Sequence, residues 1–180
     1  MSQKTRYEYD YPMAGLTTDV VFIRLGDQSD GPKCPQILLI KRKNDPFKDC
    51  WALPGGYVDV NRDNSVVEAA VRELKEETGI EIYKINLRFL NIFDTPNRDP
   101  RGRTISFAFY FFGYDWQDAS GDTKYSPVAG DDAGAVKFID IDALEHIDLA
   151  FDHKKIVHEC LDTRLYKTYD GIWTWRDKEC

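Results

Sequence analysis

The segment from Ser65 to Gly79 constrains the fold of this chain most, because it combines several signals of an amphipathic helix. Ser65 and Glu68 have the spacing of a capping box, in which the hydroxyl and the carboxylate satisfy opposite backbone amides of the first turn. Gly79 stands where a helix favours a left-handed C-terminal residue. Apolar residues recur at i, i+3, i+4 and i+7, namely Val67, Ala70, Val71 and Leu74. We therefore predict a helix over 65–78 with one buried face.

Three acidic residues lie on the flank of this predicted helix. At about 100° per residue, Glu73, Glu76 and Glu77 fall within roughly a 100° arc beside the apolar stripe. Carboxylates this close raise one another's proton affinity unless a cation joins them. Mg²⁺ prefers oxygen ligands, so the arc predicts a Mg²⁺ site, with Mn²⁺ as an alternative. Arg72 lies one turn before Glu76 and is expected to pair with it. A solvated helix face is the other reading, which the one-sided cluster disfavours.

Short apolar runs elsewhere predict buried strands at 20–23, 37–40, 87–93, 104–112 and 135–141. The polar loop 26–35 would allow the first two to pair antiparallel. Asp152 is expected to cap a second helix that runs to about residue 166. This order predicts an α/β domain with helices on both faces of a mixed sheet.

Composition and charge narrow the class of protein. The 180 residues are 42% hydrophobic and 31% charged, as is typical of a globular domain. The net charge of −7 argues against a broad surface for nucleic acid, but leaves room for a small anionic ligand. No apolar run approaches the ~20 residues that cross a bilayer, and the polar N-terminal segment (about 1–14) lacks signal-peptide features. We expect a cytoplasmic protein with no nucleic-acid or membrane partner, whose four scattered cysteines are reduced thiols.

Two stretches together resemble the Nudix box, namely residues 53–59 (LPGGYVD) and 68–80 (EAAVRELKEETGI). A signature with this many positions is far more specific than a short glycine motif. The resemblance implies an α/β/α sandwich with a mixed β-sheet, formed by a single domain over residues 1–180. It also implies a divalent metal and hydrolysis of a nucleoside diphosphate that is linked to another group.

The resemblance further implies roles for individual residues. Glu73, Glu76 and Glu77 would bind the metal together with the backbone carbonyl of Gly55. Metal ions neutralise a pyrophosphate, stabilise the leaving phosphate and lower the pKa of a bound water. Catalysis by the protein is then mostly positioning and electrostatic stabilisation.

The attacking water also needs a base. Glu76 and Glu77 are candidates, and so is an acid from a distant loop. Asp131 and Asp132, between Gly130 and a predicted strand, are the loop acids to test. A solvated Gly-Asp-Asp turn is an equally good reading of that pair.

The loop between the two stretches departs from the family pattern, which places a Glu six residues after the second glycine and eight before the arginine. Counting from Gly56 gives Arg62 and counting back from Arg72 gives Asn64, so the loop carries two extra residues. In the family this Glu mainly braces the loop. Asp63 is the candidate that would replace it.

Three arginines, Arg98, Arg101 and Arg103, lie in a predicted turn over 97–103. Arginine suits bidentate recognition of phosphate, so these residues are the candidate substrate-binding set. The alternative is a purely structural role, in which 97–103 is a charged hairpin loop whose Pro and Gly form the turn.

Residues 98–103 and 149–153 resemble segments of the ADP-ribose pyrophosphatase branch of the Nudix family. This resemblance implies a small nucleotide substrate, ADP-ribose, cleaved to AMP and ribose 5-phosphate, and it is compatible with a homodimer. His153 is expected to be a structural hydrogen-bonding residue. Two alternatives stay open: another Nudix substrate, such as a nucleoside triphosphate or nucleotide sugar, and a non-catalytic regulator that senses ADP-ribose.

Overall fold

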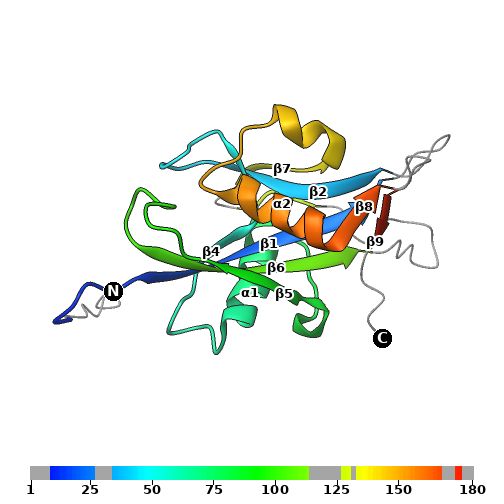
Figure 1. Cartoon of the computed structure of the whole chain (residues 1–180). Coiled ribbons are helices and arrows are strands. Elements are labelled where there is room, and N and C mark those ends of the chain that lie inside the picture. Colours follow the sequence, from blue (N-terminus) through cyan, green and yellow to red (C-terminus); the bar gives the residue numbers. More distant parts are fainter. Residues whose placement is uncertain (1–8, 27–33, 114–126, 131–132, 168–172, 176–180) are drawn as a thin grey trace.

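The computed structural model describes residues 9–26, 34–113, 127–130, 133–167 and 173–175 (Figure 1). The strands of the main sheet are β1 (Gly15–Leu25), β2 (Pro35–Arg42), β3 (Trp51–Ala52), β4 (Gly55–Tyr57), β5 (Arg88–Phe93), β6 (Thr104–Gly113) and β7 (Ala133–Asp140). The helices are α1 (Val66–Thr78) and α2 (His153–Arg164), with 3-10 turns η1 (Lys84–Asn86) and η2 (Ile141–His146). A second sheet pairs β8 (Leu165–Lys167) with β9 (Trp173–Trp175).

The main sheet is mixed, as the sequence predicts. Its strand order is β3-β2-β1-β6-β5, with β4 paired to β1 and β7 paired to β2. β1 and β6 are parallel along their whole length, whereas β1 and β2 are antiparallel, with Ile23 opposite Ile37. The long strand β1 is therefore central, and it carries its residues into the middle of the molecule.

Alternate residues of β1 belong to two separate cores. Val21 packs in one cluster with Ile156 of α2, and Val20 packs in another with Ala70 of α1. Because successive side chains of a strand point to opposite faces, α1 and α2 must cover opposite faces of the sheet, as Figure 1 shows. The predicted α/β/α sandwich is confirmed.

Both ends of α1 follow the predicted capping chemistry, with one correction. The Ser65 hydroxyl accepts from the Glu68 amide at 3.2 Å, and Gly79 (φ 70°) donates to the Lys75 carbonyl at 2.8 Å. The Glu68 carboxylate does not complete the box on Ser65. It accepts instead from the backbone and side-chain amides of Asn64, at 3.3 and 2.9 Å, because Asn64 offers two donors there.

Two further expectations need correction at the second helix. α2 ends at Arg164 rather than near residue 166, because Leu165 starts β8. Asp152 occupies the N-cap position, but its side chain makes no capping hydrogen bond, since its carboxylate binds Arg98 instead. Within the described residues, no helix is long and apolar enough to span a bilayer.

Candidate active site

A cleft of about 370 Å³ opens beside α1, and two sets among its lining residues differ in chemistry. We call the first set the carboxylate wall; it consists of Gly55, Gly56, Tyr57, Glu73 and Glu77. We call the second set the arginine wall; it consists of Asp19, Arg42, Arg98, Asp99, Arg101, Phe151 and His153. Most of the residues that the sequence singled out therefore face one cavity.

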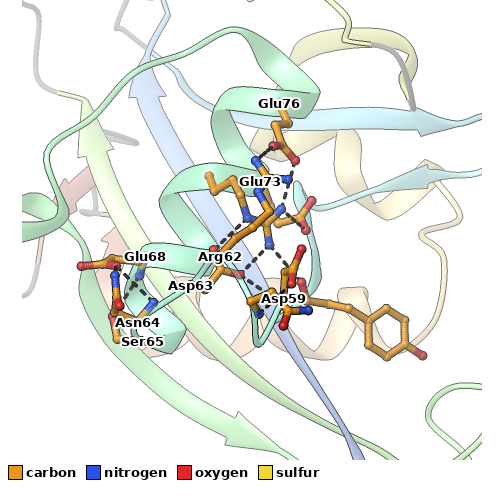
Figure 2. Close-up of polar contacts among 11 residues, drawn as sticks. Asp59, Arg62, Asp63, Asn64, Ser65, Glu68, Glu73 and Glu76 are labelled. Carbon is orange, nitrogen blue, oxygen red and sulfur yellow. Dashed lines mark hydrogen bonds and ion pairs between the residues drawn. The ribbon is translucent and has the colours of Figure 1, made fainter. Parts of the chain in front are cut away.

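Arg72 organises the carboxylate wall. Its guanidinium donates to both carboxylate oxygens of Asp63, each at 2.8 Å, and to the Tyr57 carbonyl at 3.0 Å. It also donates to Glu73 at 2.7 Å and to Glu76 at 3.0 Å (Figure 2). The predicted pair between Arg72 and Glu76 is confirmed. Asp63 takes the bracing role expected of it, so the longer loop keeps its anchor on α1.

Two glycines allow the turn that enters β4 to approach its neighbours closely. Gly55 has φ 159°, and a Cβ there would lie 2.0 Å from the Thr18 carbonyl oxygen, so a larger residue would meet the backbone of β1. A Cβ on Gly56 would lie 2.7 Å from the carboxylate of Glu73, so a larger residue there would displace the end of that side chain.

Glu73 and Glu77 face the cleft and are difficult to ionise. Burial raises the pKa of Glu77 to about 8, although Gly55 N–H donates to its carboxylate at 2.9 Å and opposes the shift. Burial also raises the pKa of Glu73, against the opposing hydrogen bond from Arg72. The charge of Glu73 further raises the pKa of Glu77, and the charges of Glu76 and Asp63 further raise that of Glu73. A cation at this position would favour the ionised form of both cleft carboxylates.

Glu76 differs from these two carboxylates. It is 45% exposed, does not line the cleft, and pairs with Arg62 at 2.8 Å as well as with Arg72. Burial by itself would raise the pKa of Glu76, but the two arginines lower it below its ordinary value. Across the described part of the chain, no group of three or more His, Cys, Asp or Glu side chains is gathered around a point where a metal would fit.

Arg98 lies in the cleft, but its charge is already compensated. It is 5% exposed and donates to Asp152 through two nitrogens, at 2.6 and 3.0 Å. A third contact reaches Asp19 at 3.4 Å. Of the three arginines predicted to bind substrate, this one is an internal support of the wall.

Arg101 is the predicted arginine that is most open to the cleft. Asp99 orients it through hydrogen bonds of 2.7 and 3.0 Å, and its guanidinium lies 5.2 Å from the ring centre of Tyr57 and 5.5 Å from that of Phe151. Its side chain is still 42% exposed. Arg103, by contrast, donates to the Asp94 carbonyl and does not line the cleft.

Sequence reasoning missed Arg42, at the end of β2. The pairing of β2 with β7 shifts register between Lys41 and Arg42, and such irregularities often redirect side chains near functional sites. The Arg42 guanidinium donates to the Pro46 carbonyl at 2.8 Å and lies 4.8 Å from the ring centre of Phe151. Among the described residues it forms no ion pair with a carboxylate. Many strands end in lysine and arginine, so the sequence alone did not indicate that Arg42 would be a site residue.

Asp19 and His153 were not predicted to be site residues. Burial by itself would raise the pKa of Asp19, but contacts with His153, Ser106 and Arg98 lower it below its ordinary value. His153 accepts a hydrogen bond from Leu53 N–H at 2.9 Å, so its expected structural role is confirmed. For His153 the signal in the sequence was the family resemblance of residues 149–153.

The predicted loop acids Asp131 and Asp132 lie outside the described residues, so their catalytic role stays a prediction. The residue before them is placed: Gly130 N–H donates to the Glu77 carbonyl at 3.0 Å. A Cβ on Gly130 would lie 1.7 Å from the Glu76 carbonyl oxygen. Residues 127–130 therefore pack directly on the C-terminal turn of α1.

Comparison with known proteins agrees with this geometry. Residues 16–160 match the NUDIX domain model. The chain is 47% identical over 124 residues to an ADP-ribose pyrophosphatase of Methanocaldococcus jannaschii, which covers 69% of this chain and 64% of that protein. It is 31% identical over 150 residues to the ADPR responsive transcriptional repressor NtrR of Acinetobacter baylyi, covering 83% of this chain and 54% of the repressor. The chain thus spans between half and two thirds of these curated relatives.

Two solved structures have the same fold. The NUDIX domain of Shewanella oneidensis NrtR complexed with ADP ribose has a TM-score of 0.71 at 25% identity, covering 86% of this chain and 92% of that one. A bifunctional NMN adenylyltransferase/ADP ribose pyrophosphatase of Francisella tularensis, complexed with AMP and a Mn ion, has a TM-score of 0.70 at 31% identity, covering 86% of this chain and 43% of that one. The matched domain, the glycine turn and the carboxylates of α1 agree on one assignment: the chain belongs to the Nudix family.

Proposed function

We propose that this protein is a Nudix pyrophosphatase that uses a divalent metal to hydrolyse ADP-ribose to AMP and ribose 5-phosphate. One observation carries the proposal: two carboxylates with raised pKa values face a wall of arginine and aromatic side chains across a single cleft. The similarity of the chain to an ADP-ribose pyrophosphatase and to an ADP ribose-bound Nudix domain supports the choice of substrate.

The residues of the carboxylate wall fit a hard divalent cation. Glu73 and Glu77 supply oxygen donors, and the missing side chain of Gly56 leaves room for the Glu73 carboxylate. We propose that these two residues and the Gly55 carbonyl hold the metal, preferably Mg²⁺, with Mn²⁺ as a substitute. Glu76 is expected to join them after leaving Arg62, to which it is bound here. When bound, such an ion neutralises the diphosphate and acidifies a coordinated water.

The arginine wall would bind the substrate. Arg101 and Arg42 both present guanidinium groups near the ring of Phe151, and arginine matches the geometry of phosphate oxygens. The rings of Tyr57 and Phe151 offer surfaces against which a base or ribose can pack. Arg98 is assigned to holding Asp19 and Asp152 rather than to direct contact with phosphate, because both its sides are occupied. Arg103 is kept as a peripheral candidate.

Glu76, Glu77 and Asp132 are the candidates for the base that activates the attacking water. Burial gives Glu77 the high proton affinity that suits a base near neutral pH, whereas Glu76 is held in its ionised form by two arginines. Replacing Asp132 with Asn should lower turnover far more than substrate affinity if that residue is the base. Unchanged turnover would return Asp132 to the solvated turn.

Several broader expectations stay proposals alongside the activity. They are a single domain over residues 1–180, a cytoplasmic location, assembly as a homodimer, and the absence of nucleic-acid and membrane partners. Size-exclusion chromatography with light scattering tests the oligomeric state directly. A gel-shift titration with duplex DNA tests the partner expectation, because some relatives are transcriptional repressors.

A second function is favoured by those relatives: an ADP-ribose sensor that binds without cleaving. The A. baylyi repressor and the S. oneidensis domain both support this alternative. The set of Glu73, Glu76 and Glu77 favours catalysis over sensing, because a sensor needs no metal-binding carboxylates.

One experiment separates these readings. The protein is incubated with Mg²⁺ or Mn²⁺ and, separately, with ADP-ribose, nucleotide sugars and nucleoside triphosphates, and the products are identified by chromatography. We expect AMP and ribose 5-phosphate from ADP-ribose. Efficient cleavage of triphosphates with ADP-ribose untouched would contradict the substrate, and tight binding of intact ADP-ribose would support the sensor.

A further inference from the structure

We infer that His153 is a positioning residue that links the glycine turn of the carboxylate wall to the arginine wall, and so fixes the distance across the cleft. The inference rests on the proposed function for its meaning in catalysis. It depends on three features of His153. The two imidazole nitrogens have separate partners, His153 completes a network of buried polar contacts, and that network reaches the segments that carry the two walls.

The two nitrogens of His153 have different roles. Leu53 N–H donates to Nδ1 at 2.9 Å, so Nδ1 carries no proton in this arrangement. The proton of the neutral ring then lies on Nε2, which faces a carboxylate oxygen of Asp19 at 3.2 Å. The side chain of His153 is 6% exposed and that of Asp19 is 8% exposed, so water does not compete strongly for either contact. The imidazole of His153 therefore connects Asp19 of β1 to Leu53, which lies two residues before Gly55 of the glycine turn.

The contacts continue from Asp19 and return to His153. Asp19 also accepts from the Ser106 hydroxyl and from Arg98, the latter at 3.4 Å. Arg98 in turn donates to Asp152 at 2.6 Å, and Asp152 is the chain neighbour of His153. This ring of contacts joins β1, β6, the loop that carries the substrate-binding arginines and the start of α2. Buried polar networks of this kind are rigid when every member has a partner.

The network of contacts reaches two parts of the site that must stay aligned, the glycine turn and the loop that carries Arg101. On one side, Leu53 precedes Pro54, whose carbonyl accepts from Val20 N–H at 2.9 Å, and Gly55 follows with its hydrogen bond to Glu77. On the other side, Arg98 precedes Asp99, the partner of Arg101. A displacement of His153 would therefore move the two walls relative to each other. Misplacement of catalytic groups by even a small distance lowers turnover strongly.

A core histidine with satisfied hydrogen bonds is the alternative, and two substitutions distinguish it from a positioning residue. In His153→Asn the amide oxygen lies near the place of Nδ1, so the acceptor for Leu53 N–H is kept and the donor to Asp19 is lost. In His153→Gln the amide nitrogen reaches the place of Nε2, so the donor to Asp19 is kept and the acceptor for Leu53 is lost. The two halves of the link are thus tested separately.

The experiment measures kcat, KM, Mn²⁺ affinity by titration calorimetry, amide exchange of Leu53 and thermal unfolding for the full chain. For His153→Gln we expect faster exchange at Leu53 and a loss of about 10-fold or more in Mn²⁺ affinity and kcat, with KM nearly unchanged, as is typical for outer partners of metal sites. For His153→Asn we expect a raised KM with kcat and Mn²⁺ affinity near those of the parent. The exposed His158, replaced by Gln, is the matched control on the same helix.

Three outcomes decide the inference. A lower kcat with unchanged KM in His153→Gln, together with a raised KM and unchanged kcat in His153→Asn, supports it. Equal losses in both parameters that follow the thermal destabilisation would overturn it and make His153 an ordinary core residue. If a His153 variant does not fold, Ser106→Ala removes a different donor to Asp19, and an unchanged KM there would also count against the link. Mn²⁺ affinity and Leu53 exchange need no substrate, so they decide the inference even if ADP-ribose is not cleaved.

Discussion

The two walls of the cleft are built from contacts of very different range along the chain. Behind the carboxylate wall, its support Arg72 reaches Glu76 four residues away, Asp63 nine residues away and Tyr57 fifteen residues away. In the arginine wall, Arg98 reaches Asp152 across 54 residues. Local spacing can therefore predict the first wall, whereas the second exists only once distant segments have met.

The comparison also shows how pairing decides which charges remain available to a ligand. Among the cleft-facing cations predicted from the sequence, Arg98 is enclosed by two carboxylates and Arg101 keeps an exposed face. Arg42, which no motif marked, forms no carboxylate pair among the described residues. An arginine-rich loop is therefore a weak guide to phosphate contacts until its partners are known.

The largest expected effect lies on the carboxylate wall. Glu77→Gln should lower kcat for the best substrate by on the order of 10²–10³, the size typical when one group that stabilises a transition state is lost. The fold should be intact, because Gln can still accept from Gly55 N–H. Steady-state kinetics at saturating Mg²⁺ measure this. Glu81→Gln, at an exposed site paired with Lys75, is the control. Near-parental turnover of Glu77→Gln would remove that residue from the metal site.

The second prediction compares the free energy of unfolding that is lost when the arginine supporting each wall is replaced. Arg98→Ala leaves Asp152 buried without its main partner and removes one of three contacts of Asp19, so it should cost about 3–5 kcal/mol of unfolding free energy. Arg72→Ala should cost less, about 1–3 kcal/mol, because Arg72 is less buried than Arg98 and Glu76 can be solvated. The buried side chain of Asp63 would keep its hydrogen bond from Asp59 N–H. Urea unfolding of the metal-free proteins compares them. If Arg72→Ala proved the more destabilising, the short-range wall would be the stronger support of the fold.

The third prediction concerns binding to the arginine wall. Arg42→Ala and Arg101→Ala should each weaken ADP-ribose binding by about 1.5–3 kcal/mol, through loss of a charge-assisted hydrogen bond. Lysine at either position should restore only part of this, since it lacks the planar fork. Calorimetry with a non-activating metal measures affinity without turnover. Arg103→Ala should have a smaller effect, and Arg88→Ala on the edge strand β5 should have none. Equal affinity in Arg42→Ala and the parent would exclude Arg42 from the site.

The smallest effect, counted per pH unit, is a pH dependence of stability in the metal-free protein. Between pH 4.5, the ordinary pKa of a glutamate, and about 8, folded Glu77 keeps a proton that the unfolded chain has released. The folded state then binds more protons, so stability falls as pH rises, by at most ~1.4 kcal/mol per pH unit. Thermal unfolding from pH 5 to 8 should show this slope, and Glu77→Gln should flatten it. Added Mg²⁺ should also stabilise the protein most near pH 8; a slope unchanged in Glu77→Gln would assign it to other groups.

Much of this protein follows from short-range patterns in its sequence. The 3.6-residue period and the capping residues predicted α1 to within a residue at its start. Of the three glutamates whose spacing predicted a shared flank, Glu73 and Glu77 line the cleft and Glu76 does not. Short apolar runs predicted β1, β2, β5, β6 and β7, although only approximately at their ends, and did not indicate the short strands β3, β4, β8 and β9. These features depend on backbone geometry over a few turns, which the order of residues specifies directly.

Tertiary structure decided the rest. The sequence placed three arginines in one loop, but it could not show that Asp152 and Asp19 neutralise Arg98, because those acids are distant along the chain. It gave no sign that Arg42 would lie over Phe151, since both positions depend on how β2 and the start of α2 pack. The pKa of Glu77 likewise depends on burial, which exists only when the sheet, α1 and the glycine turn are in contact. Spacing can assign residues to a face, but packing decides which charges on that face are left for a ligand.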